Sequence, residues 1–167
     1  MKSVCAALLA ALIAAPAAAQ EARAWSVETP KESEAWLRYG MPDTEDRQLA
    51  FACVRKSGQV QVGATIGRQM AAGRDSSGAW VDRAGIRAPW PLSVAVASES
   101  AATTLRGQAR PDQTEGGTTV LTEFSTRAPV VAEFRKTGVI VLTAGGETIQ
   151  PPPAPKSMVR KFLGACK

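Results

Sequence analysis

The chain has 167 residues, and 20 Lys and Arg against 15 Asp and Glu give it a formal charge of +5. It has no histidine, which excludes Ser-His-Asp and Cys-His nucleophiles and histidine-ligated haem, and which removes the commonest ligand of the usual zinc sites. The modest charge and the single tyrosine argue against nucleic acid as a partner. We expect neither a metal nor a cofactor.

The N-terminus predicts export. Lys2 is followed by an apolar run over residues 4–15 and by Pro-Ala-Ala-Ala-Gln at 16–20, which is typical of a secretory signal with small residues at its cleavage site. The run is too short to cross a bilayer, which takes about 20 residues, and no later stretch approaches that length. We therefore expect a signal peptide at 1–19, no membrane span, and a mature protein in the periplasm or outside the cell.

Cleavage would leave residues 20–167, a length that suits a single domain. The signal removes one positive charge, on Lys2, so the formal charge becomes +4. It also removes Cys5, and the mature chain keeps only Cys53 and Cys166. In an oxidising compartment two cysteines favour one intramolecular disulfide.

Alternation of apolar and polar residues with period two predicts strands along most of the chain. The clearest pair flanks the turn at Ser57-Gly58, where Leu49, Phe51 and Cys53 share one face of the first strand. The predicted strands are 25–29, 34–39, 48–55, 59–66, 91–98, 101–109, 118–126 and 138–144.

Two helices are predicted late in the chain. Residues 129–136 begin with a proline and are followed by Gly138, which ends the helix. Residues 157–166 carry an apolar stripe that includes Phe162, Leu163 and Cys166, with Arg160 and Lys161 on the other side. Because Cys53 and Cys166 both fall on apolar faces, we predict a structural Cys53–Cys166 disulfide that clamps the C-terminus. The alternative is a redox-active thiol pair.

The fold class expected from these elements is mainly β (α+β). The short strands and polar spacers indicate an antiparallel β-sandwich or barrel, with one short late helix and a C-terminal helix. Residues 20–167 would form this single β-rich domain.

The segment 68–110 is the candidate binding region. It combines six arginines with two tryptophans in a Gly- and Pro-containing stretch, and Arg and Trp are enriched at protein interfaces. In the alternative interpretation the tryptophans cover the core and the arginines are solvated edges. The residues of the candidate surface are Trp80, Trp90, Arg74, Arg83 and Arg87.

Acidic residues offer two further hypotheses. Asp75 and Asp82 flank a turn-rich segment and could serve as the carboxylate pair of a histidine-independent hydrolase. Asp43, Glu45 and Asp46 cluster in a loop, but the spacing lacks the calcium-loop signature, so a solvated turn is favoured.

Trp36, the motif Tyr39-Gly40-x-Pro42-x-x-x-Asp46, Leu49-x-Phe51-x-Cys53 and the terminal Phe162-Leu163-x-x-Cys166 together resemble small uncharacterised periplasmic proteins of alphaproteobacteria. This resemblance implies a periplasmic location and the disulfide. Phe51-x-Cys53 followed by a glycine turn and Val60-x-Val62 is similar to the periplasmic lysozyme-inhibitor barrels, which implies a lysozyme-inhibitor-like module as one alternative.

The function expected from these observations is that of an exported, non-catalytic binding or cell-envelope accessory protein. Its partner would be an envelope or extracellular protein or glycan. The signal, the disulfide, the lack of histidine and the lack of a catalytic motif all point this way, and the carboxylate-based hydrolase is the alternative from another class.

Overall fold

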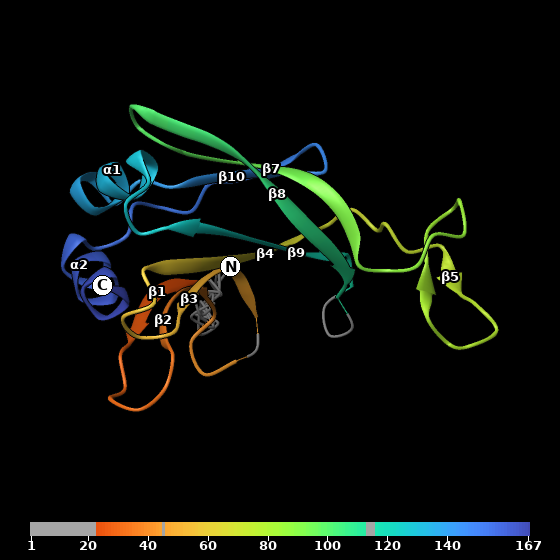
Figure 1. The fold of residues 1–167 in the computed structure, drawn as a ribbon, viewed down its shortest axis with the longest axis horizontal. Helices are drawn as coiled ribbons and strands as arrows, with labels where there is room; N and C mark the ends of the chain where they lie inside the picture. Colours follow the sequence, from red (N-terminus) through yellow and green to blue (C-terminus); the bar gives the residue numbers. More distant parts are fainter. Residues whose placement is uncertain (1–22, 45, 113–115) are drawn as a thin grey trace, which may run out of the picture.

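A curled sheet of nine antiparallel strands forms the body of the molecule (Figure 1). The computed structural model describes residues 23–44, 46–112 and 116–167, so the expected signal peptide and Cys5 lie outside the described residues. The order across the sheet is β1-β2-β3-β4-β9-β8-β7-β10-β11. These strands are β1 (Ala24–Glu28), β2 (Ala35–Gly40), β3 (Arg47–Cys53), β4 (Gln59–Ile66), β7 (Trp90–Ser98), β8 (Ala101–Pro111), β9 (Thr118–Ser125), β10 (Val141–Ala144) and β11 (Glu147–Ile149).

The sheet has an inner and an outer face because side chains alternate along each strand. Leu37, Phe51 and Val62 lie opposite one another on β2, β3 and β4, and all three are buried on the inner face. A shift of register by one residue would turn this apolar set outward, so burial of one face specifies the pairing.

The two helices lie at one end of the molecule and pack together (Figure 1). Helix α1 (Pro129–Thr137) starts at a proline and stops at Gly138, which adopts a positive φ of 79° and donates its N–H to the carbonyl of Phe134 at 2.8 Å. A side chain at position 138 would overlap the carbonyl oxygen of Ala154. Helix α2 (Lys156–Cys166) follows and buries Val159, Phe162, Leu163, Ala165 and Cys166.

Aromatic rings join the helices to the inner face of the sheet. The ring of Phe51 lies 5.4 Å from that of Phe134 in α1 and 6.4 Å from that of Phe162 in α2. Trp25 of β1 packs on the same cluster, 6.4 Å from Phe51, and its indole N–H donates to the carbonyl of Pro152 at 2.8 Å. This bond connects edge strand β1 to the segment that follows the opposite edge strand β11.

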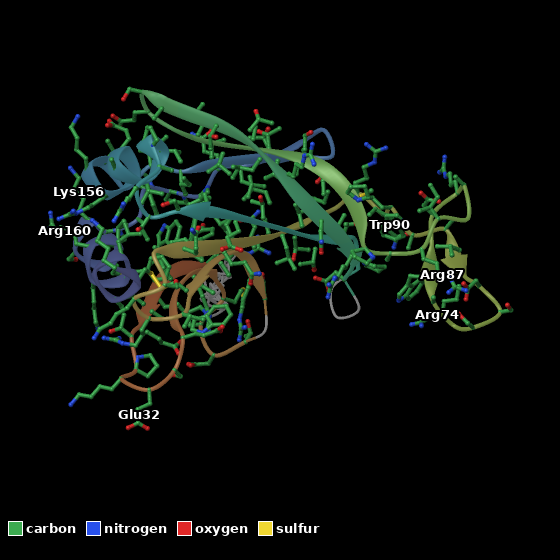
Figure 2. All side chains as sticks on the ribbon, in the orientation of Figure 1. Glu32, Arg74, Arg87, Trp90, Lys156 and Arg160 are labelled. Atoms are coloured by element: carbon green, nitrogen blue, oxygen red, sulfur yellow. A yellow bond between two sulfur atoms is a disulfide. The ribbon has the colours of Figure 1, made fainter. Side chains whose placement is uncertain are left out.

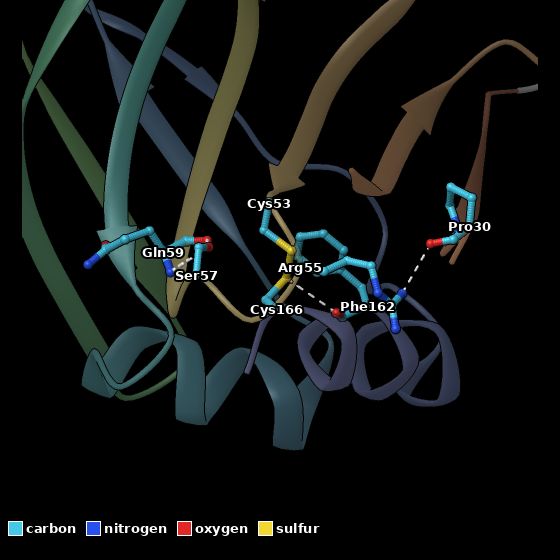
Figure 3. The surroundings of a disulfide bond; sticks show 7 residues. All are labelled: Pro30, Cys53, Arg55, Ser57, Gln59, Phe162 and Cys166. Carbon is cyan, nitrogen blue, oxygen red and sulfur yellow. Dashed lines mark hydrogen bonds between the residues drawn. A yellow bond between two sulfur atoms is a disulfide. The ribbon is translucent and has the colours of Figure 1, made fainter. Parts of the chain in front are cut away.

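The sulfurs of Cys53 and Cys166 are joined at 2.03 Å, as the two periodicities predict (Figure 3). Both cysteines are buried. Two backbone bonds lie beside the bridge, because the amides of Lys56 and Gly58 in the β3–β4 turn donate to the carbonyls of Ala165 and Cys166 at 3.1 and 2.8 Å. The C-terminus is therefore held on the β3–β4 hairpin by both covalent and hydrogen bonds.

The mainly β, antiparallel class with two late helices is confirmed, and its particular form is a curled half-barrel. The eight predicted strands and both helices are present, with ends that differ by a few residues. Strand β11 and a small two-stranded sheet of β5 (Gly73–Arg74) and β6 (Trp80–Val81) were not predicted. Among the described residues, no helix is long and apolar enough to span a membrane.

Candidate functional site

Residues 71–89, here called the arm, leave the end of the sheet opposite the helices (Figures 1 and 2). The arm is joined to the sheet by a root at residues 67–70. The carboxylate of Glu147 accepts the amides of Gly67 and Arg68 at 2.9 and 2.6 Å, and the hydroxyl of Thr118 accepts the amide of Met70 at 3.2 Å. The root is thus fixed to β9 and β11, while the arm extends beyond them.

Asp75 organises the first turn of the arm. One carboxylate oxygen accepts the amide and the hydroxyl of Ser77 at 2.8 and 2.7 Å and the amide of Ala79 at 3.1 Å. The other oxygen accepts the guanidinium of Arg87 at 2.6 Å. These donors stabilise the charged form, and they lower the pKa of Asp75 to about 2, with the Ser77 hydroxyl as the largest cause.

Asp82 organises the second turn. Its carboxylate accepts the amides of Ala84 and Ile86, both at 2.9 Å, while Gly85 supplies a positive φ of 78°. The turn leaves the side chain of Ile86 58% exposed. Ile86 is one of two large apolar side chains that stand exposed among the described residues, so this turn presents an apolar contact at the surface.

Trp80 lies between the two turns with Arg74 stacked on it. The guanidinium carbon of Arg74 is 4.1 Å from the centre of the indole ring, and the same group donates to the carbonyl of Gly78 at 2.7 Å. The indole N–H of Trp80 is buried and has no acceptor among the described residues. Pairing of β5 with β6 and an isolated bridge between Val81 and Arg87 complete the arm.

The residues of the candidate surface therefore have different roles in the structure. Three of them make contacts within the arm: Arg74 stacks on Trp80, and Arg87 pairs with Asp75. Arg87 nevertheless keeps 63% of its side chain exposed. Arg83 is exposed and makes no described contact. Ile86, which sequence reasoning did not select, stands on the same turn as Arg83.

Trp90 is a correction to the candidate surface. It is only 2% exposed, and its indole N–H donates to the carbonyl of Ile86 at 2.8 Å. It begins β7 on the inner face, in phase with the buried Val94 and Val96. The period-two pattern of β7 already indicated that Trp90 faces inward. Trp90 therefore fits the alternative interpretation, in which the tryptophans cover the core, and it lies at the base of the arm (Figure 2).

The geometry of Asp75 and Asp82 favours a role in the turns over acid–base catalysis. Each carboxylate accepts backbone amides of its own turn. A general acid needs a raised pKa, whereas the pKa of Asp75 is lowered. The contacts of Asp75 therefore do not prepare it to donate a proton.

The outer face of the sheet carries a second cluster that the sequence did not reveal. The guanidinium carbon of Arg38 on β2 lies 4.5 Å from the ring centre of Trp36 and pairs with Glu28 at 2.8 Å. Burial lowers the pKa of Arg38, and the nearby charge of Arg47 lowers it further. Trp36 and Arg47 line a hollow of about 350 Å³ together with the small residues Ala50, Ala52, Gly63 and Ala64.

Alternation alone places Arg38 and Trp36 on the outer face, but the approach of Arg47 depends on the irregular pairing between Tyr39 and Gly40 at the end of β2.

The acidic loop that the sequence singled out contains Asp46, which pairs with Arg23 at 2.9 Å. Within the described residues, no group of three or more Asp, Glu, Cys or His side chains is placed to hold a metal ion.

No family model, no curated protein and no solved structure matches this chain.

Proposed function

We propose that the protein is an exported, non-catalytic binding module of the cell envelope that contacts an envelope or extracellular protein or glycan through its arm. The observation that carries this proposal is an arm that packs on itself and still exposes Ile86 and Arg83. An exposed large apolar side chain beside an unpaired arginine is typical of a contact surface.

The arm is ordered before it meets a partner. Asp75 and Asp82 accept the amides of their turns, and Arg74 stacks on Trp80. Such preorganisation reduces the entropy that binding would cost. It also gives a role to these polar side chains in a segment that adds little to the core.

Arg83 and Ile86 are the residues through which the arm is expected to act. Neither side chain supports the fold, because Arg83 makes no described contact and the hydrogen bonds of Ile86 are made by its backbone. Both can therefore be changed without loss of the turn.

The test compares variants in one envelope extract. The immobilised protein is expected to retain a partner, the double variant Arg83→Glu/Ile86→Ser to lose it, and Arg106→Glu, an exposed charge reversal on β8, to keep it. Circular dichroism checks that each variant is folded. Equal retention by all three proteins, or turnover of a glycan or ester substrate by the wild type, would show that the proposal is wrong.

A further inference from the structure

The positive charge of the chain is concentrated at the end that carries the two helices. This helical end consists of α1, α2 and the turns at residues 29–34, 54–58, 98–101 and 126–128, together with Lys167. It holds ten Lys and Arg against four Glu, whereas the rest of the described chain holds nine Arg against eight Asp and Glu. The ten basic residues are Lys31, Arg55, Lys56, Arg127, Arg135, Lys136, Lys156, Arg160, Lys161 and Lys167.

Hydrogen bonds hold these segments side by side, so the charges share one surface. The amide of Thr126 donates to the carbonyl of Gly58 at 2.9 Å, and Arg55 donates to the carbonyl of Pro30 at 3.2 Å. The hydroxyl of Ser98 donates to the carbonyl of Val139 at 2.7 Å. Together with the bonds from the β3–β4 turn to α2, these contacts gather five separate stretches of chain into one end.

Almost all of this charge is exposed and unpaired. Nine of the ten basic residues are exposed, the exception being the half-buried Arg55. Of these ten residues, only Lys136 forms an ion pair within the described part of the chain, with Glu133 at 3.6 Å. The sequence of α2 produces this pattern, because its buried stripe leaves Arg160 and Lys161 on the other side of the helix, and Lys156 is exposed as its first residue. Figure 2 shows Lys156 and Arg160 at this end of the molecule.

We propose that the helical end is a docking surface for an anionic lipid bilayer. The charge is spread over a broad surface, which suits an extended anionic layer better than a single small anion. Lys56, Arg127 and Lys167 also line a hollow of about 400 Å³ between the β3–β4 turn and the start of α1, a place for a phosphate headgroup.

An apolar contact favours a bilayer over a dissolved polyanion. Val54 is 61% exposed at the start of the β3–β4 turn, directly before Arg55 and Lys56. An exposed valine followed directly by two cations suits the boundary between headgroups and acyl chains, where apolar atoms insert while long basic side chains reach the phosphates. A soluble acidic polymer has no apolar layer into which the side chain of Val54 could insert.

The surface would also orient the molecule. The arm and the helices lie at opposite ends of the longest axis (Figure 1), so adsorption through the helical end leaves the arm facing away from the bilayer. The proposal does not depend on the arm having a partner, since it rests on charge and exposure at the other end.

Vesicle co-sedimentation tests the proposal with the purified protein. We expect binding to vesicles of phosphatidylcholine with 30% phosphatidylglycerol, little binding to phosphatidylcholine alone, and at least a tenfold fall in the partition coefficient between about 50 and 300 mM salt, because salt screens surface charge. Lys156→Glu/Arg160→Glu should lower partitioning at least tenfold. The matched control Arg106→Glu/Arg110→Glu makes the same change of charge on exposed positions of β8 and should lower it less than threefold.

A second variant keeps the test independent of α2. Val54→Ser retains every charge and should lower partitioning about threefold by removing apolar area. Equal losses in the helix variant and its control, equal binding to neutral vesicles, or absence of binding would overturn the proposal. So would displacement from the vesicles by a soluble polyanion such as heparin or duplex DNA at equal charge concentration, which would assign the surface to a dissolved polymer.

Discussion

Removal of the Cys53–Cys166 bond should cost several kcal/mol of stability. The bond joins residues 113 positions apart. In the chain-entropy model a loop of that length removes about 16 cal/mol/K from the denatured state, or about 4.8 kcal/mol at 25 °C. The double variant Cys53→Ala/Cys166→Ala restores that entropy and also removes two buried sulfur atoms.

The native state of the variant should remain close to that of the wild type. Helix α2 still buries Phe162 and Leu163, and the β3–β4 turn still donates its two amides to the last turn of the helix. The loss therefore falls on the denatured state, which expands when the link is gone. This reasoning predicts a larger urea m-value as well as a lower midpoint, since m follows the surface exposed on unfolding.

Urea unfolding followed by circular dichroism measures both quantities. Reduction of the wild type with dithiothreitol separates the bond from the lost sulfur volume, because it breaks the bond and keeps both sulfurs. Thiol titration of the unreduced protein should find neither Cys53 nor Cys166 free. A free energy of unfolding within 1 kcal/mol of the wild type for both the reduced protein and the double variant would refute the reasoning.

Three further predictions follow from the core, a turn and the arm. Phe51→Ala should cost about 3–5 kcal/mol in the same urea assay, because the ring is 1% exposed and contacts both helices; Phe51→Leu, which keeps most of the volume, should cost less than half as much. Gly138→Ala should lower stability by more than 1 kcal/mol, because the residue has positive φ and its new methyl group overlaps Ala154; a neutral result would show that α1 can end differently. Because the folded pKa of Asp75 is about 2, below the ordinary 3.8, its contribution to the arm is complete above pH of about 4 and is lost as the pH falls toward 2; tryptophan fluorescence should report this change, and Trp80→Phe should remove most of it.

Period-two alternation could be read from the sequence because the sheet buries only one face. Leu49, Phe51 and Cys53 stand in phase on β3, as do Val60 and Val62 on β4. The same physics allowed the disulfide to be predicted, since a buried strand face and a buried helix stripe both contained a cysteine.

Short elements could not be predicted in this way. Strand β11 has three residues, and β5 and β6 have two each, too few for a period to repeat. Strand β10 begins at Val141, three residues after the predicted start, because Gly138 ends α1 and bonds to Ala154 before the strand can pair. Such boundaries depend on tertiary contacts.

The candidate site was predicted only in outline. Composition located the region that forms the arm, but it could not separate Trp80, stacked against Arg74, from Trp90 in the core. Ile86 was missed because exposure of a single isoleucine is set by the Asp82 turn. The electrostatic influence of Arg47 on Arg38 depends on strand register.

Strand order also determines when the core can form during synthesis. Strand β4 pairs with β9, whose first residue, Thr118, lies 52 positions after Ile66 at the end of β4. As the chain emerges N-terminus first, β1 to β4 can form a meander, but the open edge of β4 stays unpaired until β9 arrives. The last helix must then complete the aromatic cluster around Phe51. Unpaired edges and late long-range contacts favour aggregation before folding, so this chain needs protection from the first hairpin until its final helix is available.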